Sequence, residues 1–149
     1  MSKIGTVDVF AFTGAKLSGL AQLNMNLLES GGSVCTGIQN LIQEWLILML
    51  TPKGSVVFDE NRGSNFLPEA MNATVESDIK TSFVFANADV IEQLRRTSDD
   101  KPDDEIVDKV TLDTLNLKDG LLSVKATITS KAGESRTVTL PIHNNPIIL

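Results

Sequence analysis

The feature that most constrains the fold is a long apolar run that ends at a proline. From Val34 to Leu50, apolar residues recur at spacings of three and four, which predicts an amphipathic helix with a broad apolar face. Ser33 is a suitable N-cap for this helix. Pro52 disfavours helical geometry at Thr51, so the helix is expected to stop there. The residues of the apolar face are Ile38, Leu41, Ile42, Trp45, Leu46, Met49 and Leu50.

This run does not have the properties of a membrane span or of a phosphate loop. A membrane-spanning helix needs roughly 20 mostly apolar residues, whereas the run is short and polar side chains interrupt it at Gln39, Asn40, Gln43 and Glu44. The turn at 52–55 lacks the upstream glycine and the spacing with which backbone amides cradle a phosphate. The sequence therefore predicts a helix that is buried in the core, against a partner, or both.

Two glycines are expected to steer the chain after the helix. Gly54 can supply a turn with positive φ, and Gly63 follows the polar turn at 59–62. Residues 56–58 are predicted to be briefly extended, and Phe66 is predicted to return to the core. The residues expected to define the turn are Thr51, Pro52, Gly54 and Gly63.

The remaining elements follow from the spacing of apolar residues. A second helix is predicted over 75–96, followed by an exposed acidic loop over 97–105. Strict alternation over 21–27 and a β-rich patch over 6–12 predict two strands near the N-terminus.

The last third of the chain predicts a sheet. Apolar and polar residues alternate over 107–117, 122–129 and 136–142, and glycine-containing turns separate the three runs. The fold class predicted is α+β, with two main helices packed on a small antiparallel sheet that ends in a C-terminal three-stranded meander. At 149 residues the whole chain, 1–149, is expected to form one domain.

Composition narrows the function classes. A net charge of −6 and a pI near 4.7 argue against binding to nucleic acid, which requires clustered Lys and Arg. One cysteine, Cys35, and one histidine, His143, cannot form a disulfide framework or a four-ligand zinc site. Because residues 1–8 lack the apolar core of a signal peptide, we expect a cytoplasmic protein. We expect no cofactor, no metal, no nucleic-acid partner and no membrane partner.

The sequence contains no convincing catalytic set. Glu44 with Asp59 or Glu60 is the one carboxylate pair near the expected centre of the fold that could serve glycoside hydrolysis. Cys35 would lie in the first turn of the helix predicted over 34–50. Its favoured role there is that of a small side chain buried in the core, rather than a reactive thiol. We therefore expect no catalytic residue.

The order of features around the turn resembles that of the baseplate wedge family of contractile phage tails, which has been described as lysozyme-like. The shared pattern is a helix that ends in Leu50-Thr51, a turn glycine at Gly54, the charged connector 59–62, and Gly63 before an apolar pair at 66–67. A second helix, an acidic linker and the strands follow in the same order, so that the resemblance covers about 32–142. The Glu-Pro-Arg step that the family usually carries is replaced here by 91–96 and Lys101-Pro102-Asp103.

The resemblance implies a structural, non-enzymatic component of a virion, located in the tail baseplate and assembled in the host cytoplasm. Its long helix would join other baseplate wedge proteins, and its strand edges would join the first ring of the tail sheath protein, with tail tube or hub proteins as further partners. A generic α+β interaction module is the alternative, and a tail-associated peptidoglycan hydrolase is a remote one. The expected interface residues are Ile38, Leu41, Ile42, Trp45, Leu46, Met49, Leu50, Arg62, Phe66, Val124, Ile128 and Val138.

Overall fold

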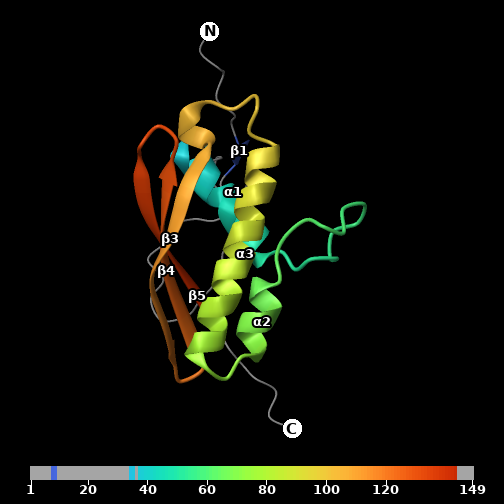
Figure 1. Cartoon of the computed structure of the whole chain (residues 1–149), viewed down its shortest axis with the longest axis vertical. Coiled ribbons are helices and arrows are strands. Elements are labelled where there is room, and N and C mark those ends of the chain that lie inside the picture. The colour runs from blue at the N-terminus through green and yellow to red at the C-terminus, as the bar shows by residue number, and fades with distance from the viewer. Residues whose placement is uncertain (1–7, 10–33, 36, 144–149) are drawn as a thin grey trace.

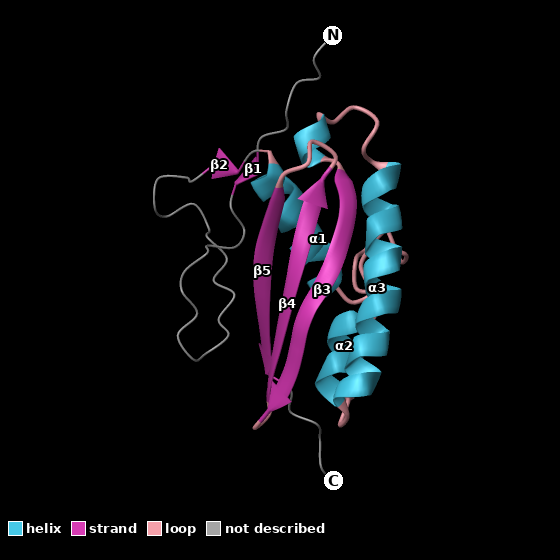
Figure 2. Ribbon diagram, turned by 60° about the vertical axis from the view of Figure 1, so that its left-hand side comes forward, coloured by secondary structure: helices cyan, strands magenta, loops and turns pink. Residues whose placement is uncertain are grey.

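Three antiparallel strands form one layer of the fold, and helices cover one face of that layer (Figures 1 and 2). The computed structural model describes residues 8–9, 34–35 and 37–143. Within these residues the architecture is α+β, which confirms the predicted fold class. The elements are β1 (Asp8–Val9), β2 (Val34–Cys35), α1 (Ile38–Leu50), α2 (Phe66–Asn72), α3 (Glu76–Arg96), η1 (Asp103–Glu105), β3 (Val107–Lys118), β4 (Leu121–Ser130) and β5 (Ser135–His143).

The meander predicted for the last third of the chain is confirmed. The strand order is β3-β4-β5, with both pairs antiparallel. Alternation places one set of side chains on the helix-covered face, where Leu122, Val124, Ala126 and Ile128 of β4 are buried. The opposite face is polar, and threonines there hydrogen-bond across the strands.

The helices pack against different parts of the sheet. Helix α1 contacts β4 and β5, α3 runs beside β3, and α2 packs on both α1 and α3 (Figure 2). The aromatic centre of the core joins one residue from each helix. The ring of Phe83 meets Trp45 edge-on at 6.2 Å and Phe66 edge-on at 5.6 Å between centroids. All three side chains are buried.

The helix predicted over 75–96 agrees closely with α3, whereas α1 is shorter than the helix predicted over 34–50. Helix α3 begins at Glu76 and ends at Arg96. Helix α1 begins at Ile38 rather than at Val34, because Gly37 adopts φ 62 and ψ −138, which is not helical. Residues 34–35 instead pair with 8–9 as a short antiparallel ladder. Cys35 is therefore in a strand, and the prediction that it lies in the first turn of a helix is wrong.

Several smaller predictions also need correction or fall outside the described residues. Residues 56–58 form turns rather than an extended piece. Residues 66–72 form a helix, α2, that the spacing of apolar residues does not predict. Pro68 fits there because the N–H groups of the first turn of a helix have no partner within the helix. The acidic loop 97–105 ends in η1, where Glu105 is buried. The prediction that Ser33 caps the first helix is wrong, because the N-cap of α1 is Gly37. The strand predicted over 21–27 lies outside the described residues.

Candidate functional site

The turn after α1 is built around a close approach of two backbones. The amide of Ser64 donates to the carbonyl oxygen of Thr51 at 2.9 Å, and the amide of Lys53 donates to the carbonyl oxygen of Ser64 at 3.2 Å. Gly63 lies between these contacts with φ 99, and a Cβ added there would be 2.1 Å from the Thr51 oxygen. This position therefore requires glycine on steric grounds as well as conformational ones.

Polar side chains fix the same turn to both neighbouring helices. The Gln93 side-chain amide donates to the Gly63 carbonyl oxygen at 2.7 Å and accepts from the Gly63 N–H at 3.0 Å. The Ser64 hydroxyl donates to the Met49 carbonyl oxygen at 2.9 Å, which satisfies one free acceptor at the end of α1. Lys53 forms an ion pair with Asp89 of α3. Gln93 and Asp89 were not singled out from the sequence, because a polar residue on the helix surface carries no signal of its partner.

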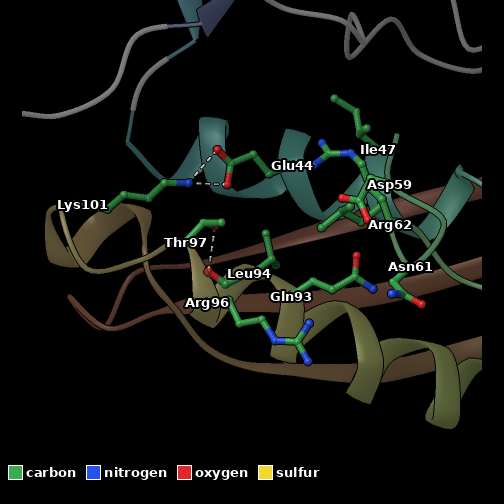
Figure 3. A pocket seen from close by; sticks show the side chains of 11 residues that line it. Glu44, Ile47, Asp59, Asn61, Arg62, Gln93, Leu94, Arg96, Thr97 and Lys101 are labelled. Carbon is green, nitrogen blue, oxygen red and sulfur yellow. Dashed lines mark hydrogen bonds and ion pairs between the residues drawn. The ribbon is translucent and has the colours of Figure 1, made fainter. Parts of the chain in front are cut away.

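A groove opens between α1, the C-terminal part of α3 and the loop that leads to Gly63 (Figure 3). Its volume is about 430 Å³. Across it, the Nζ of Lys101 lies 2.7 Å from both carboxylate oxygens of Glu44 (Figure 3). The side chains of this ion pair are only 13% and 29% exposed, so the pair joins α1 to the segment after α3. The other lining residues are Ile47, Leu48, Asp59, Asn61, Arg62, Gln93, Leu94, Arg96 and Thr97.

The groove brings together two of the three carboxylates that the hydrolase alternative would use. Glu44 and Asp59 both line it, whereas Glu60 does not. Both oxygens of Glu44 are already engaged by Lys101. Among residues 8–9, 34–35 and 37–143, no group of three or more His, Cys, Asp or Glu side chains could hold a metal ion. None of the described helices is long and apolar enough to cross a membrane.

We expect Glu44→Gln to lower the free energy of unfolding by less than about 1 kcal/mol, because a partly exposed ion pair contributes little. The difference from the unchanged protein should shrink further in 1 M salt, which screens the interaction. Urea unfolding at low and high salt measures both effects. A loss above about 3 kcal/mol would show instead that the pair behaves as a fully buried one.

Most of the predicted interface residues lie in this chain's own core. Eight of them are buried, and they come from α1, α2 and β4; they are Ile38, Leu41, Trp45, Leu46, Met49, Phe66, Val124 and Ile128. The resemblance implies that these residues contact a partner, whereas in the structure α2, α3 and the sheet cover most of these side chains. Ile42, Leu50 and Val138 are half-buried, and Arg62 is exposed.

The two edges of the sheet differ in what covers them. At the β3 edge, the Leu117 N–H donates to the Glu76 carboxylate at 2.8 Å, and Arg95 donates to the Asp108 carbonyl oxygen at 3.2 Å. Both acceptor and donor groups come from α3, which runs along this edge (Figure 2). At the other edge, no strand in the described part of the chain pairs with the outer side of β5.

The register shows which backbone groups β5 presents on its outer side. The Ser130 N–H donates to the Glu134 carbonyl oxygen, so this pair is a hydrogen-bonded pair of the β4–β5 ladder. Hydrogen-bonded and non-hydrogen-bonded pairs alternate along an antiparallel ladder. The N–H and C=O groups of Ser135, Thr137 and Thr139 therefore point away from β4. Pro141 occupies the same class of position, where the missing N–H does not interrupt the pairing with β4.

Comparison with protein-family models, with curated proteins and with solved structures finds no match for this chain.

Proposed function

We propose that this chain is a structural assembly protein that accepts a strand from a partner at the outer edge of β5. The observation that carries the proposal is the contrast between the two sheet edges. Side chains of α3 bind the β3 backbone at Leu117 and Asp108, while β5 presents a row of backbone donors and acceptors to which no described strand pairs. Such a row is a template for strand addition.

The number of outward-facing backbone groups on β5 limits how long a stretch of a partner strand can pair with it. Three consecutive outward positions, Ser135, Thr137 and Thr139, offer both a donor and an acceptor, and Pro141 offers only an acceptor. An added strand would thus pair along the N-terminal two thirds of β5. The side chains of Ser135, Thr137 and Thr139 are exposed, which leaves room for a partner beside them.

The resemblance to contractile-tail wedge proteins suggests the setting for this function. In that setting the chain is a non-enzymatic part of the tail baseplate in the virion, assembled in the host cytoplasm. The strand that β5 accepts would belong to the first ring of sheath protein, and other wedge proteins, and tube or hub proteins, would contact other surfaces. The resemblance alone supports this setting. A generic interaction module that uses the same edge is the alternative.

A proline substitution at the edge tests the proposal. Thr137→Pro removes one outward N–H and leaves the β4–β5 hydrogen bonds intact, so we expect a folded protein that no longer forms the complex. Thr137→Val keeps the N–H and is the matched control, which should bind like the unchanged protein. Co-expression with the products of neighbouring genes, followed by native mass spectrometry, measures complex formation.

Two results would contradict the strand-addition proposal. One is a Thr137→Pro protein that unfolds with an unchanged midpoint and still assembles as fully as Thr137→Val. The other is the absence of any complex with every neighbouring gene product. Clearing of a peptidoglycan suspension that is lost in Glu44→Gln would instead favour the hydrolase alternative.

A further inference from the structure

The loop between α1 and α2 ends in an apolar tip that nothing in the described chain covers. The loop projects away from the helices and the sheet (Figure 1). At its tip, Val57 is 74% exposed and Phe58 is 102% exposed. Phe58 also has φ 74, a conformation that bulky residues rarely adopt. A fully exposed aromatic ring in a strained conformation contributes nothing to the packing of the described residues, which points to a role in binding.

The base of this loop is held firmly. The amide of Gly54 donates to the carbonyl oxygen of Glu60 at 3.0 Å, and the two backbones meet again where Ser64 bonds Thr51. The two hydrogen bonds between Gln93 and Gly63, and the ion pair between Lys53 and Asp89, attach the base of the loop to α3. Because the tip stands on a fixed base, a partner would lose little of its binding free energy to ordering the loop.

The charge of the tip indicates the chemistry of what would bind it. Asp59 and Glu60 follow Phe58 directly, and both are exposed. Residues 54–61 contain no lysine or arginine; of the two basic residues that flank them, Lys53 pairs with Asp89, and Arg62 lies beside Asp59 in the groove (Figure 3). Within the described residues, no ion pair involves either carboxylate. A surface that matches this tip offers an apolar pocket for the ring and cationic side chains for the two carboxylates.

We propose that the docking tip, residues 56–60, inserts Phe58 into an apolar pocket of a second protein, and that lysine or arginine side chains border the pocket. Phe58 is the anchor, since buried aromatic side chains carry a large part of the affinity of such contacts. An anionic membrane surface is disfavoured, because it would repel the two carboxylates. The tip lies on the opposite side of the molecule from β5 (Figures 1 and 2), so the chain would join two partners.

Phe58→Gly separates a docking role from a structural one. Glycine adopts positive φ without strain, so we expect the midpoint of thermal unfolding to stay the same or to rise by a few degrees. Docking should weaken by about 30-fold or more, as for the loss of an interface anchor. A fall in the thermal midpoint of more than about 4 °C would show that Phe58 supports this fold, and would overturn the proposal.

A photo-crosslinker at the tip identifies the partner and tests its chemistry. We place p-benzoylphenylalanine at Phe58 and express the chain together with the products of its neighbouring genes. The expected result is an adduct to one other protein, at a peptide that contains apolar residues and a lysine or arginine. The double variant Asp59→Lys, Glu60→Lys should reduce this adduct at least about tenfold, because it reverses the charge that the pocket recognises. The affinities of the purified unchanged protein and of Phe58→Gly for that partner are then compared.

Position 75 is the matched control, since Val75 is apolar and 51% exposed but lies between α2 and α3. The proposal is overturned by an equal adduct from position 75, by an adduct only to a second copy of this chain, or by no protein adduct. It is also overturned if charge reversal leaves the adduct unchanged. Sedimentation of the unchanged protein, but not Phe58→Gly, with vesicles of phosphatidylcholine and phosphatidylglycerol at 3:1 would identify a membrane site instead.

Discussion

Gly63→Ala is expected to lower the free energy of unfolding by about 3–5 kcal/mol, the largest effect of any single methyl group that we can assign in this chain. The added Cβ would lie 2.1 Å from the carbonyl oxygen of Thr51 and 2.9 Å from its carbonyl carbon. Both atoms belong to the backbone, so the clash cannot be relieved by rotating a side chain. At φ 99, alanine is strained as well.

The clash would also disrupt the hydrogen bonds that converge on this turn. Moving Gly63 away from Thr51 stretches the bond between the Ser64 amide and the Thr51 oxygen, and it displaces both groups that Gln93 holds. These groups are half-buried or buried, so the loss of their partners is costly. Urea unfolding followed by the fluorescence of Trp45 measures the change.

Gly54→Ala is the control for this substitution. Gly54 also has positive φ, 82, but no atom lies within 4 Å of where its Cβ would be. The cost there should be that of backbone strain alone, about 1 kcal/mol. If the two substitutions proved equally costly, the close approach to Thr51 would not be what requires glycine at position 63.

Trp45→Ala should lower the free energy of unfolding by about 4 kcal/mol or more. The side chain is fully buried and packs edge-on against Phe83, so its removal leaves a large cavity. It also leaves the Asn87 side-chain oxygen without the indole N–H that donates to it at 2.9 Å. Because a domain of this size has a stability of about 5–15 kcal/mol, the variant is expected to be close to unfolding at 37 °C. Thermal unfolding by circular dichroism measures the change.

Phe85→Ala is the control for the loss of an aromatic ring, and two further variants separate the packing of Trp45 from its hydrogen bond. Phe85→Ala removes an aromatic ring that is 72% exposed and should change stability by less than about 0.5 kcal/mol. Trp45→Phe alone leaves Asn87 unpaired, whereas Trp45→Phe with Asn87→Leu replaces both partners by apolar groups. The double variant should therefore be more stable than Trp45→Phe. The opposite order would show that the hydrogen bond contributes little.

Local pattern was sufficient to predict the regular elements of the C-terminal half. Helix α3 and the meander follow from the periods of 3.6 and 2, and the turns that separate the strands carry Gly120 and Gly133. The end of α1 at Leu50 was also predictable, since Pro52 acts on its immediate neighbour. In each case the cause lies within a few residues of its effect.

The candidate sites were harder to predict, because the groups that form them are far apart in the sequence. Gln93 binds Gly63 across 30 residues, and Lys101 binds Glu44 across 57. The predicted interface on α1 illustrates the same limit. Its apolar pattern correctly predicted burial, but only the packed structure showed that this chain covers most of that face itself.

The sequence by itself determined where α3 and the three strands of the meander form, where α1 stops, and that two glycines direct the turn that follows. These are consequences of backbone sterics and of side-chain periodicity, which act over short distances. The tertiary structure alone decided which surfaces stay uncovered, because burial depends on every element at once. It covered most of the apolar face of α1, placed α3 along the β3 edge, and left the outer edge of β5 and the ring of Phe58 as features that the packing of the described residues does not explain.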